Sequence, residues 1–266
     1  MSNQKRSNQI HVVLGLGSSG INAAKLLKSE GKEVLVLENN SNEKLIDISQ
    51  RMKSEGINVI LLDTPLNINN FTPWIDRISS ITVSPGIDWE HKTLKELRGK
   101  HIFMQSEVEL AWQRLNNLPS IGITGTNGKT TVTNMLNHVL KLNNFNTDIG
   151  GNSGKALSKI ALEIKHKNNQ KPNWIVLELS SYQIEGSPRL KPNIGIWTTF
   201  TPDHLERHHD IETYFKIKRS LLEKSSIRIY NSDDKYLSNK RKELPEGIWV
   251  GINKQSSYSH PPTFWI

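Results

Sequence analysis

The stretch Ile121–Thr131, with the sequence IGITGTNGKTT, joins a short apolar run to a polar loop that contains two glycines. Apolar residues then recur with helical spacing from Thr130 to Leu142, so the loop connects a predicted strand to a predicted helix. Glycines let backbone N–H groups curl around an anion, and a helix N-terminus adds positive potential. The stretch predicts a phosphate-binding loop, and the alternative is an ordinary glycine-rich turn.

The end of this loop carries the two residue types that nucleotide chemistry requires. In a P-loop the lysine reaches the β- and γ-phosphates and the next hydroxyl binds Mg²⁺, and these places are taken by Lys129 and Thr130. The usual spacing requires glycine at position 123, where this chain has Ile123. We therefore predict a short variant of the P-loop that binds a nucleotide.

A second glycine loop, Gly15–Gly20 (GLGSSG), follows the apolar run Ile10–Leu14. Helical spacing over Ile21–Ser29 and a second apolar run that ends at Glu38 complete a βαβ unit, which implies a parallel sheet. Taken by itself, the GxGxxG pattern with an acid at the end of the next strand predicts a Rossmann-like dinucleotide site. It leaves an NAD-dependent oxidoreductase open as a function.

The two loops divide the chain. We predict an α/β fold with a Rossmann-like domain over residues 1–118 and an incomplete P-loop α/β domain over residues 119–266, joined by the polar segment Leu115–Ser120. The second domain has further apolar runs that predict buried strands at Trp174–Leu179 and Ile194–Phe200.

Composition excludes several classes of protein. The 266 residues contain no cysteine, which removes disulfides, thiolate metal sites and cysteine nucleophiles, and no apolar run is long enough to span a membrane. Lys and Arg outnumber Asp and Glu by 34 to 26, giving a net charge of +8, but the basic residues are dispersed. We expect a cytoplasmic protein that binds small anions and neither nucleic acid nor membrane.

Two charged residues stand where apolar surroundings are predicted. Glu178 ends a buried strand, where a carboxylate beside a phosphate loop can hold Mg²⁺ or simply reach solvent. Lys218 falls in the middle of the apolar face of the predicted helix 211–224. Because an unpartnered buried ammonium is costly, Lys218 must extend to solvent, pair or be modified. His208 and His209 are expected to be solvated.

Three motifs carry a family resemblance: TGTNGKTT from Thr124, ELSSYQIE from Glu178 and TPDHLERH from Thr201. They resemble the Mur ligases, which activate a carboxylate with ATP and join it to an amine. The resemblance implies that ATP binds to Gly125, Thr126, Asn127, Gly128, Lys129, Thr130 and Thr131.

The same resemblance implies the metal and catalytic residues. Mg²⁺ would be held by Thr130, Glu178 and His204, and catalysis would depend on Lys129, His204 and Lys218. Lys218 would be carbamylated and its new carboxylate would help to hold a second Mg²⁺, while Asp203 and Arg207 would neighbour His204. Asn152, in the turn Gly150–Gly154, would contact the substrate near the carboxylate being activated.

The first loop resembles the family member that adds D-glutamate to UDP-N-acetylmuramoyl-L-alanine in peptidoglycan precursor synthesis. There the loop holds the UDP diphosphate, which implies that Ser18 and Ser19 donate to phosphate oxygens and that the turn Glu38–Asn40 lies near uracil. The implied partners are these two substrates, and the implied oligomeric state is a monomer. The implied substrate-binding residues are Gly17, Ser18, Ser19, Glu38, Asn39, Asn40, Ser84, Pro85, Gly86 and Asn152.

The resemblance runs from Ile10 to Ile252, whereas Mur ligases continue with further strands, an asparagine motif for adenine and a C-terminal domain. We expect that C-terminal domain to be absent and the chain alone to be inactive or nearly so, because lid closure and the amine site would be missing. The alternatives are a non-catalytic remnant that binds a nucleotide or a UDP-sugar, and the NAD-dependent oxidoreductase.

Overall fold

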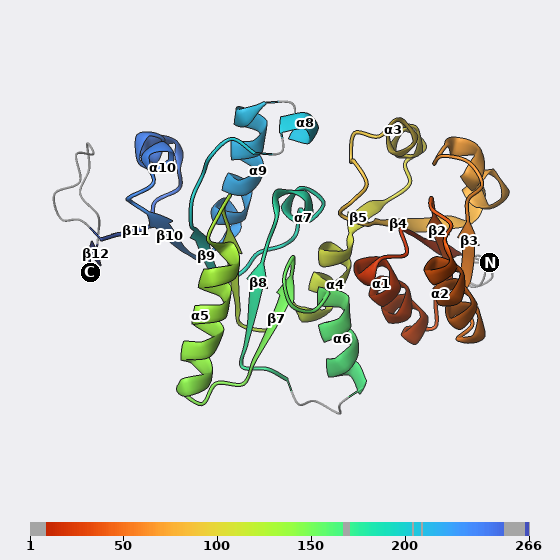
Figure 1. Ribbon diagram of the computed structural model, residues 1–266, viewed down its shortest axis with the longest axis horizontal. Coiled ribbons are helices and arrows are strands. Elements are labelled where there is room, and N and C mark those ends of the chain that lie inside the picture. The colour runs from red at the N-terminus through yellow and green to blue at the C-terminus, as the bar shows by residue number, and fades with distance from the viewer. Residues whose placement is uncertain (1–8, 167–170, 204, 209, 253–263, 266) are drawn as a thin grey trace, which may run out of the picture. The chain divides into compact units, whose positions relative to one another are not determined.

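The computed structural model describes residues 9–166, 171–203, 205–208, 210–252 and 264–265 (Figure 1). The chain forms two compact units. Unit 1 comprises the described parts of residues 1–113 and 156–169, and unit 2 those of 114–155 and 170–266. Each unit contains a parallel β-sheet with helices, so the predicted α/β fold class is confirmed.

Unit 1 is built on a five-stranded sheet with the strand order β3-β2-β1-β4-β5. The order reverses beside β1, and the glycine loop follows β1 at this switch point, where open α/β sheets bind ligands. The elements are β1 (Ile10–Leu14), α1 (Ser18–Ser29), β2 (Glu33–Glu38), α2 (Glu43–Ser54), β3 (Asn58–Leu61), η2 (Ile68–Arg77), β4 (Ile78–Val83), α3 (Lys92–Gly99), β5 (Met104–Ser106), α4 (Glu107–Leu115) and α6 (Leu157–His166).

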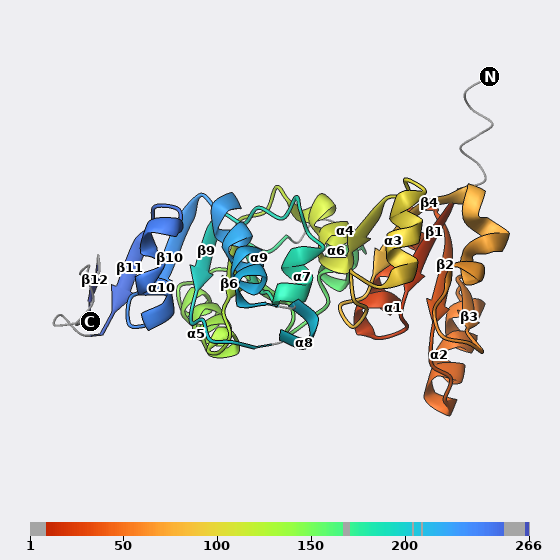
Figure 2. The ribbon, with the colours of Figure 1, turned by 90° about the horizontal axis from the view of Figure 1, so that it is seen from above.

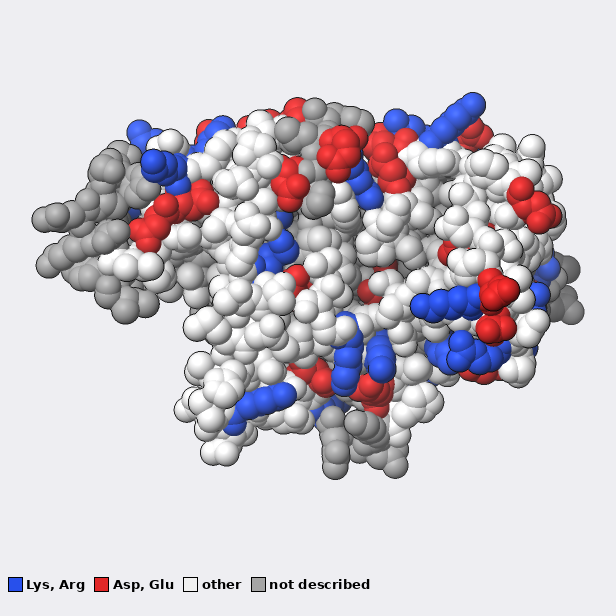
Figure 3. Space-filling view, in the orientation of Figure 1, with Lys and Arg blue, Asp and Glu red and all other residues white. Residues whose placement is uncertain are grey.

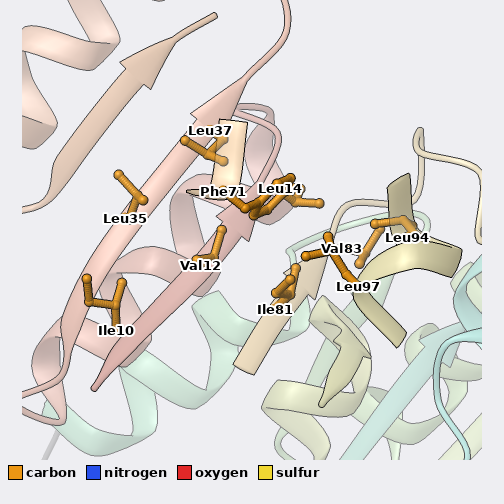
Figure 4. Close-up of a cluster of buried hydrophobic side chains, with 10 residues drawn as sticks. All are labelled: Ile10, Val12, Leu14, Leu35, Leu37, Phe71, Ile81, Val83, Leu94 and Leu97. Carbon is orange, nitrogen blue, oxygen red and sulfur yellow. The ribbon is translucent and has the colours of Figure 1, made fainter. Parts of the chain in front are cut away.

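The core of unit 1 lies where β1, β2 and β4 meet η2 and α3 (Figure 4). Alternate residues of β1 face this cluster because side chains on a strand point to opposite faces in turn. The cluster comprises Ile10, Val12, Leu14, Leu35, Leu37, Phe71, Ile81, Val83, Leu94 and Leu97, all of them buried.

Helix α6 lies far along the chain from the rest of unit 1, yet it packs against α1. The Glu107 carboxylate accepts a hydrogen bond from the backbone N–H of Ser158 at 2.5 Å, at the start of α6. Near the other end of the helix, the Lys165 ammonium donates to the backbone carbonyl of Ser29. The sequence pattern assigns residues 156–166 to the second domain, whereas in the structure they belong to unit 1. Contacts between residues far apart in the chain leave no local pattern that could have predicted this.

Unit 2 has a seven-stranded parallel sheet with the order β12-β11-β10-β9-β6-β8-β7. Its elements are β6 (Ser120–Thr124), α5 (Lys129–Leu142), β7 (Thr147–Gly151), β8 (Trp174–Glu178), α7 (Ser181–Glu185), β9 (Ile194–Trp197), α8 (Leu205–His208), α9 (Ile211–Lys224), β10 (Ile227–Asn231), α10 (Lys235–Asn239), η3 (Arg241–Glu243), β11 (Ile248–Gly251) and β12 (Phe264–Trp265).

In unit 2 the helices lie on both sides of the sheet. Figures 1 and 2 show α5 on one face and α9 and α10 on the other. Val132, Leu136 and Leu140 of α5 pack against buried residues of β6 and β8, because residues four apart share one face of a helix. Since β6 lies between β8 and β9, the glycine loop that follows it emerges between the ends of these two neighbours.

The surface of the protein carries both signs of charge. On the face shown in Figure 3, Lys and Arg side chains are interspersed with Asp and Glu. Among the described residues, none of the helices combines the length and the apolar character needed to cross a membrane.

Candidate active site

The glycine loop after β6 adopts a conformation that depends on two of its glycines. Gly125 has φ of +153°, and a Cβ atom there would lie 2.0 Å from the Thr198 Oγ1 atom. Gly128 has φ of +80°, in the left-handed region that side chains rarely adopt. Two hydrogen bonds join the loop to the residues that follow β9. The Thr126 N–H donates to the Thr199 carbonyl at 2.8 Å, and the Asn127 N–H donates to the Thr199 hydroxyl at 2.9 Å.

Helix α5 begins directly after the loop, and no side chain of the described chain caps its N-terminus. The first-turn N–H groups of a helix have no partner within the helix, and they carry a partial positive charge. The start of α5 at Lys129 is therefore suited to bind a phosphate group. The Thr130 and Thr131 side chains beside it are exposed.

Lys129 is folded back over the loop. Its ammonium donates to the backbone carbonyls of Gly125 and Thr126 at 3.0 and 2.8 Å. Burial lowers the pKa of Lys129, while the negative charges of Glu178 and Asp203 act in the opposite direction. Carbonyl groups are weaker partners than phosphate oxygens, so an incoming phosphate can displace them.

Lys218 is buried on the apolar face of α9, with 1% of its surface exposed, so extension to solvent is excluded. Its ammonium donates to the Gly125 carbonyl at 2.9 Å and lies 4.7 Å from the centre of the Tyr214 ring. Burial lowers the pKa of Lys218 to about 7, with a smaller contribution from the positive charge of Lys129. Two lysines thus bind the same loop carbonyl.

Glu178 lies at the end of β8, with only 1% of its surface exposed. One carboxylate oxygen accepts from the Asn152 side-chain amide at 2.9 Å, and the backbone N–H of Asn152 donates to the Glu178 carbonyl at 2.7 Å. Gly151 permits this approach, because a Cβ atom there would lie 2.2 Å from that carbonyl. The turn Gly150–Gly154 is therefore built around Glu178.

The second carboxylate oxygen of Glu178 is buried and has no hydrogen-bond partner in the described residues. A buried charged oxygen without a partner is costly, so a cation or a donor at this point would stabilise it. Carboxylate oxygens are preferred Mg²⁺ ligands, and this atom fits the predicted metal site. Within the described residues no three His, Asp or Glu side chains converge on one point, and the predicted ligand His204 lies outside them.

The expectation that His208 is solvated is wrong. His208 is buried, and its Nε2 atom lies 2.9 Å from the Ser181 hydroxyl. Its ring lies 5.3 Å from the rings of Tyr182 and Tyr214, while the guanidinium of Arg207 stacks on Tyr182 at 4.0 Å. The partners come from α7 and α9, so the residues next to His208 in the chain carry no signal of this burial. His209 lies outside the described residues.

In unit 1 a cavity of about 560 Å³ opens at the carboxyl ends of β1, β2 and β4. It brings together every substrate-binding residue that the sequence predicts for this unit. These residues are Gly17, Ser18, Ser19, Glu38, Asn39, Asn40, Ser84, Pro85 and Gly86.

Glu38 has a different role from the acid of a dinucleotide site. Its carboxylate oxygens accept from the backbone N–H groups of Leu16 at 2.6 Å and Asn40 at 2.9 Å. The carboxylate therefore holds the glycine loop and the next turn together, rather than standing free for ribose hydroxyls. Helix α1 starts at this loop, and no described side chain caps it, so its N-terminus suits a phosphate.

Comparison with known sequences gives the family. The sequence model of the Mur ligase middle domain matches residues 123–260, more than half of the chain. The chain belongs to the Mur ligase family. The family predicted from the three motifs is confirmed, and the glycine loop, Glu178 and Lys218 all lie in this Mur ligase middle domain.

The most similar relatives include three ligases named UDP-N-acetylmuramoylalanine--D-glutamate ligase. The protein of Prochlorococcus marinus strain NATL2A is 76% identical over the whole chain, which covers 57% of that relative. The ligases of a second P. marinus strain, SARG, and of Synechococcus sp. strain CC9902 are 51% and 48% identical over 97% and 96% of the chain. This Mur ligase chain therefore spans little more than half the length of these relatives.

Solved structures of other Mur ligases share the fold. A UDP-N-acetylmuramate:L-alanyl-gamma-D-glutamyl-meso-diaminopimelate ligase from Neisseria meningitides covers 92% of the chain with a TM-score of 0.60 at 13% identity, and the chain covers 78% of it. A UDP-N-acetylmuramate-alanine ligase from Thermotoga maritima covers 92% of the chain with a TM-score of 0.52 at 21% identity, and 53% of that structure is covered. At these identities the likeness supports the fold alone.

Proposed function

We propose that this chain carries the UDP-substrate and ATP sites of an ATP-dependent, ADP-forming ligase that joins D-glutamate to UDP-N-acetylmuramoyl-L-alanine. The observation that carries the proposal is the position of Lys218, which is buried beside the phosphate loop. Its ammonium and the ammonium of Lys129 donate to the same backbone carbonyl. An oxidoreductase built on the first loop has no use for this second cation. The names of the similar relatives support the choice of substrates.

In this proposal the residues of unit 2 stabilise negative charge during phosphoryl transfer. The first-turn amides of α5 and the Lys129 ammonium hold the phosphates and offset the charge that develops as the terminal phosphoryl group is transferred. The UDP-substrate carboxylate attacks that phosphorus, the bond to ADP breaks, and an acyl phosphate forms. The D-glutamate amine then attacks the acyl carbon through a tetrahedral intermediate, and phosphate leaves. No covalent bond to the protein is formed.

The proposed Mg²⁺ ligands are Thr130, Glu178 and His204, and Mg²⁺ when bound would neutralise phosphate charge. The fit rests on the Glu178 oxygen that is buried and has no hydrogen-bond partner in the part of the chain that the structure describes. Asn152 holds the other oxygen and so orients the carboxylate. In the proposal Asn152 also lies near the carboxylate that is activated.

Carbamylation of Lys218 is part of the proposal. Because burial lowers its pKa to about 7, a large share of the amine is neutral at neutral pH. The neutral nitrogen adds to the carbon of CO₂ and releases a proton, which yields a carbamate that can serve as a metal ligand. A carbamate resonance in the ¹³C NMR spectrum, seen with ¹³C-bicarbonate and lost in Lys218→Met, is the expected result.

The test of the proposed activity is ADP release by the purified chain with ATP, Mg²⁺, UDP-N-acetylmuramoyl-L-alanine and D-glutamate. Release that requires D-glutamate and vanishes in Lys129→Ala supports the ligase. Normal binding of both nucleotide substrates without ADP release assigns the chain a binding function only. Binding of NADH at micromolar concentration in the first cavity would contradict the proposal.

A further inference from the structure

The segment of residues 198–201, directly after β9, holds the glycine loop of unit 2 on one side. The Thr198 hydroxyl donates to the Asn127 carbonyl at 2.6 Å. The Thr126 hydroxyl donates to the Thr201 carbonyl at 3.0 Å and accepts from the Thr201 N–H at 3.1 Å. The conformation of the phosphate loop therefore depends on where this segment lies.

The same segment is held on its other side by the end of β10. Strand β10 lies beside β9 and runs parallel to it, so both strands end at the same edge of the sheet (Figure 2). Asn231 is the last residue of β10, and its side-chain amide donates to the Thr198 carbonyl at 2.8 Å. The amide oxygen of Asn231 accepts from the Asp233 N–H at 2.9 Å, which fixes the end of the amide that faces Thr198.

Asp234, in the turn that follows β10, supplies a second hydrogen bond to this segment. One of its carboxylate oxygens accepts from the Phe200 N–H at 2.7 Å. The other accepts from the Leu237 N–H at 2.9 Å and so caps the start of α10. The carboxylate therefore ties α10 to the segment after β9, and the turn after β10 holds that segment at two points.

We propose that Asn231 and Asp234 are positioning residues for the phosphate loop. They act through the segment 198–201, which in turn binds Thr126 and Asn127 of the loop. A phosphate loop binds its anion through backbone N–H groups whose directions must match the ligand, and a displacement of about 1 Å can be costly. The inference rests on the proposed ATP site and adds the residues that keep that site in shape.

For Asp234, electrostatic repulsion and positioning predict opposite changes in ATP affinity. A carboxylate repels a triphosphate, so loss of its charge alone would tighten ATP binding. Loss of the acceptor for the Phe200 N–H releases the segment after β9 and would weaken ATP binding. Asp234→Ser separates the two effects, because serine is also a good N-cap for α10. Asp233→Ser is the matched control, since it removes the same charge from a carboxylate that accepts from the Ile252 N–H at 2.8 Å.

The first measurement is calorimetric titration of the full 266-residue chain with ATP and Mg²⁺. Asn231→Ala and Asp234→Ser are each expected to weaken ATP binding at least fivefold, whereas Asp233→Ser leaves it unchanged or tighter. Titration with UDP reports on the cavity of unit 1, and its affinity is expected to be the same in all three variants. The circular dichroism melting curve checks that each variant is folded at the temperature of the titration.

Hydrogen exchange of the free protein tests the positioning role without a ligand. The N–H groups of Thr126 and Asn127 are both hydrogen-bonded to Thr199 in the free protein. In Asn231→Ala and Asp234→Ser, the peptide that contains these amides is expected to exchange at least fivefold faster, measured by mass spectrometry. The peptide that covers the buried strand β8 is expected to keep its rate. A merely structural role would accelerate exchange in both peptides.

Three outcomes would overturn the inference. In the first, Asn231→Ala and Asp234→Ser bind ATP as tightly as the unmodified chain does. In the second, neither variant changes the exchange of the loop amides. In the third, Asp233→Ser weakens ATP binding as much as Asp234→Ser does, so the effect does not pass through the segment after β9. An unmodified chain that binds no ATP would instead contradict the proposed function, and hydrogen exchange would then decide the positioning role alone.

Discussion

Lys218 is the residue whose chemistry depends most on its surroundings. Its ammonium is buried in α9, donates to the Gly125 carbonyl and lies near the positive charge of Lys129. Desolvation and a like charge both disfavour the protonated form, which is why its pKa falls to about 7. The folded protein therefore contains, near neutral pH, a lysine that is readily deprotonated.

The first prediction concerns the pH dependence of stability. Since the pKa of Lys218 is about 7 when folded and 10.5 otherwise, the unfolded chain binds the extra proton between these values. The free energy of unfolding should therefore rise with pH, by up to about 1.4 kcal/mol per unit from this residue. The contribution of Lys218 to the free energy of unfolding should be complete above the pKa of the unfolded chain and should decrease as the pH drops toward 7. Urea unfolding between pH 7 and 9 in CO₂-free buffer, where Lys218 keeps its free amine instead of the proposed carbamate, measures the slope.

The variant Lys218→Met should flatten this slope, because it removes the titrating group. Lys216→Met is the matched control, since Lys216 lies exposed on the same helix. Equal slopes in Lys218→Met and in the unmodified protein would contradict the assigned pKa.

The second prediction concerns Gly125. Its φ is +153°, and a Cβ atom at this position would lie 2.0 Å from Thr198, so Gly125→Ala must distort the loop. We expect a loss of about 1–3 kcal/mol in unfolding free energy and at least a tenfold weaker binding of ATP by calorimetry. Gly99→Ala, where a Cβ would meet no atom within 4 Å, is the control. Unchanged ATP affinity in Gly125→Ala would show that the loop does not bind the phosphates.

At the scale of elements, a buried carboxyl group binds the start of α6 in unit 1. Glu107 accepts from the Ser158 N–H at the start of α6, and burial raises the pKa of Glu107. Its other oxygen is buried and has no partner in the described chain. The neutral form of this group is therefore better suited to the site than the charged form.

The third prediction follows from this contact. Glu107→Ala leaves the Ser158 N–H buried without an acceptor and should cost about 1–3 kcal/mol of unfolding free energy. Glu107→Gln keeps the acceptor and removes the buried charge, so it should be far less destabilising at pH 7. Urea denaturation of both variants tests the order, with the exposed Glu43→Ala of α2 as reference. The reverse order would rule out the acceptor role.

At the scale of the whole molecule, the two proposed anion sites lie in two different units of one chain. The cavity of unit 1 opens at the start of α1, and the glycine loop of unit 2 leads into the start of α5; no side chain among the described residues caps either helix. Each site uses the same physical device, a helix N-terminus preceded by a glycine turn. In the proposed ligase they bind different ligands, the UDP-linked substrate and ATP.

The fourth prediction is that the two sites can be disabled separately. Ser18→Asp places a negative charge at the start of α1 and should weaken binding of UDP-N-acetylmuramoyl-L-alanine at least tenfold, with the ATP affinity unchanged. Lys129→Ala should have the opposite pattern. Calorimetric titration of each variant with each ligand gives the four affinities. If Ser18→Asp leaves the UDP-substrate affinity intact, the cavity of unit 1 is not the UDP site.

The sequence alone determined those features that depend on neighbours along the chain. Alternation of apolar runs and glycine turns predicted both parallel α/β units, and the spacing of Tyr214, Phe215, Leu221 and Leu222 predicted that Lys218 lies on the apolar face of its helix. The motif after Thr124 predicted the phosphate loop, and Gly125 and Gly128 there adopt the positive φ angles that glycine permits. Helical period, strand run and turn chemistry are local properties, so they can be read from the order of residues.

Which distant groups meet depends on the tertiary structure. It brought α6 onto α1, Asn152 onto Glu178, and His208 between the rings of Tyr182 and Tyr214. Most of these contacts join residues far apart in the chain, and burial of a polar group is decided by its spatial neighbours. The local sequence pattern does not indicate those neighbours. For this reason His208 was expected to be in solvent, whereas it is buried.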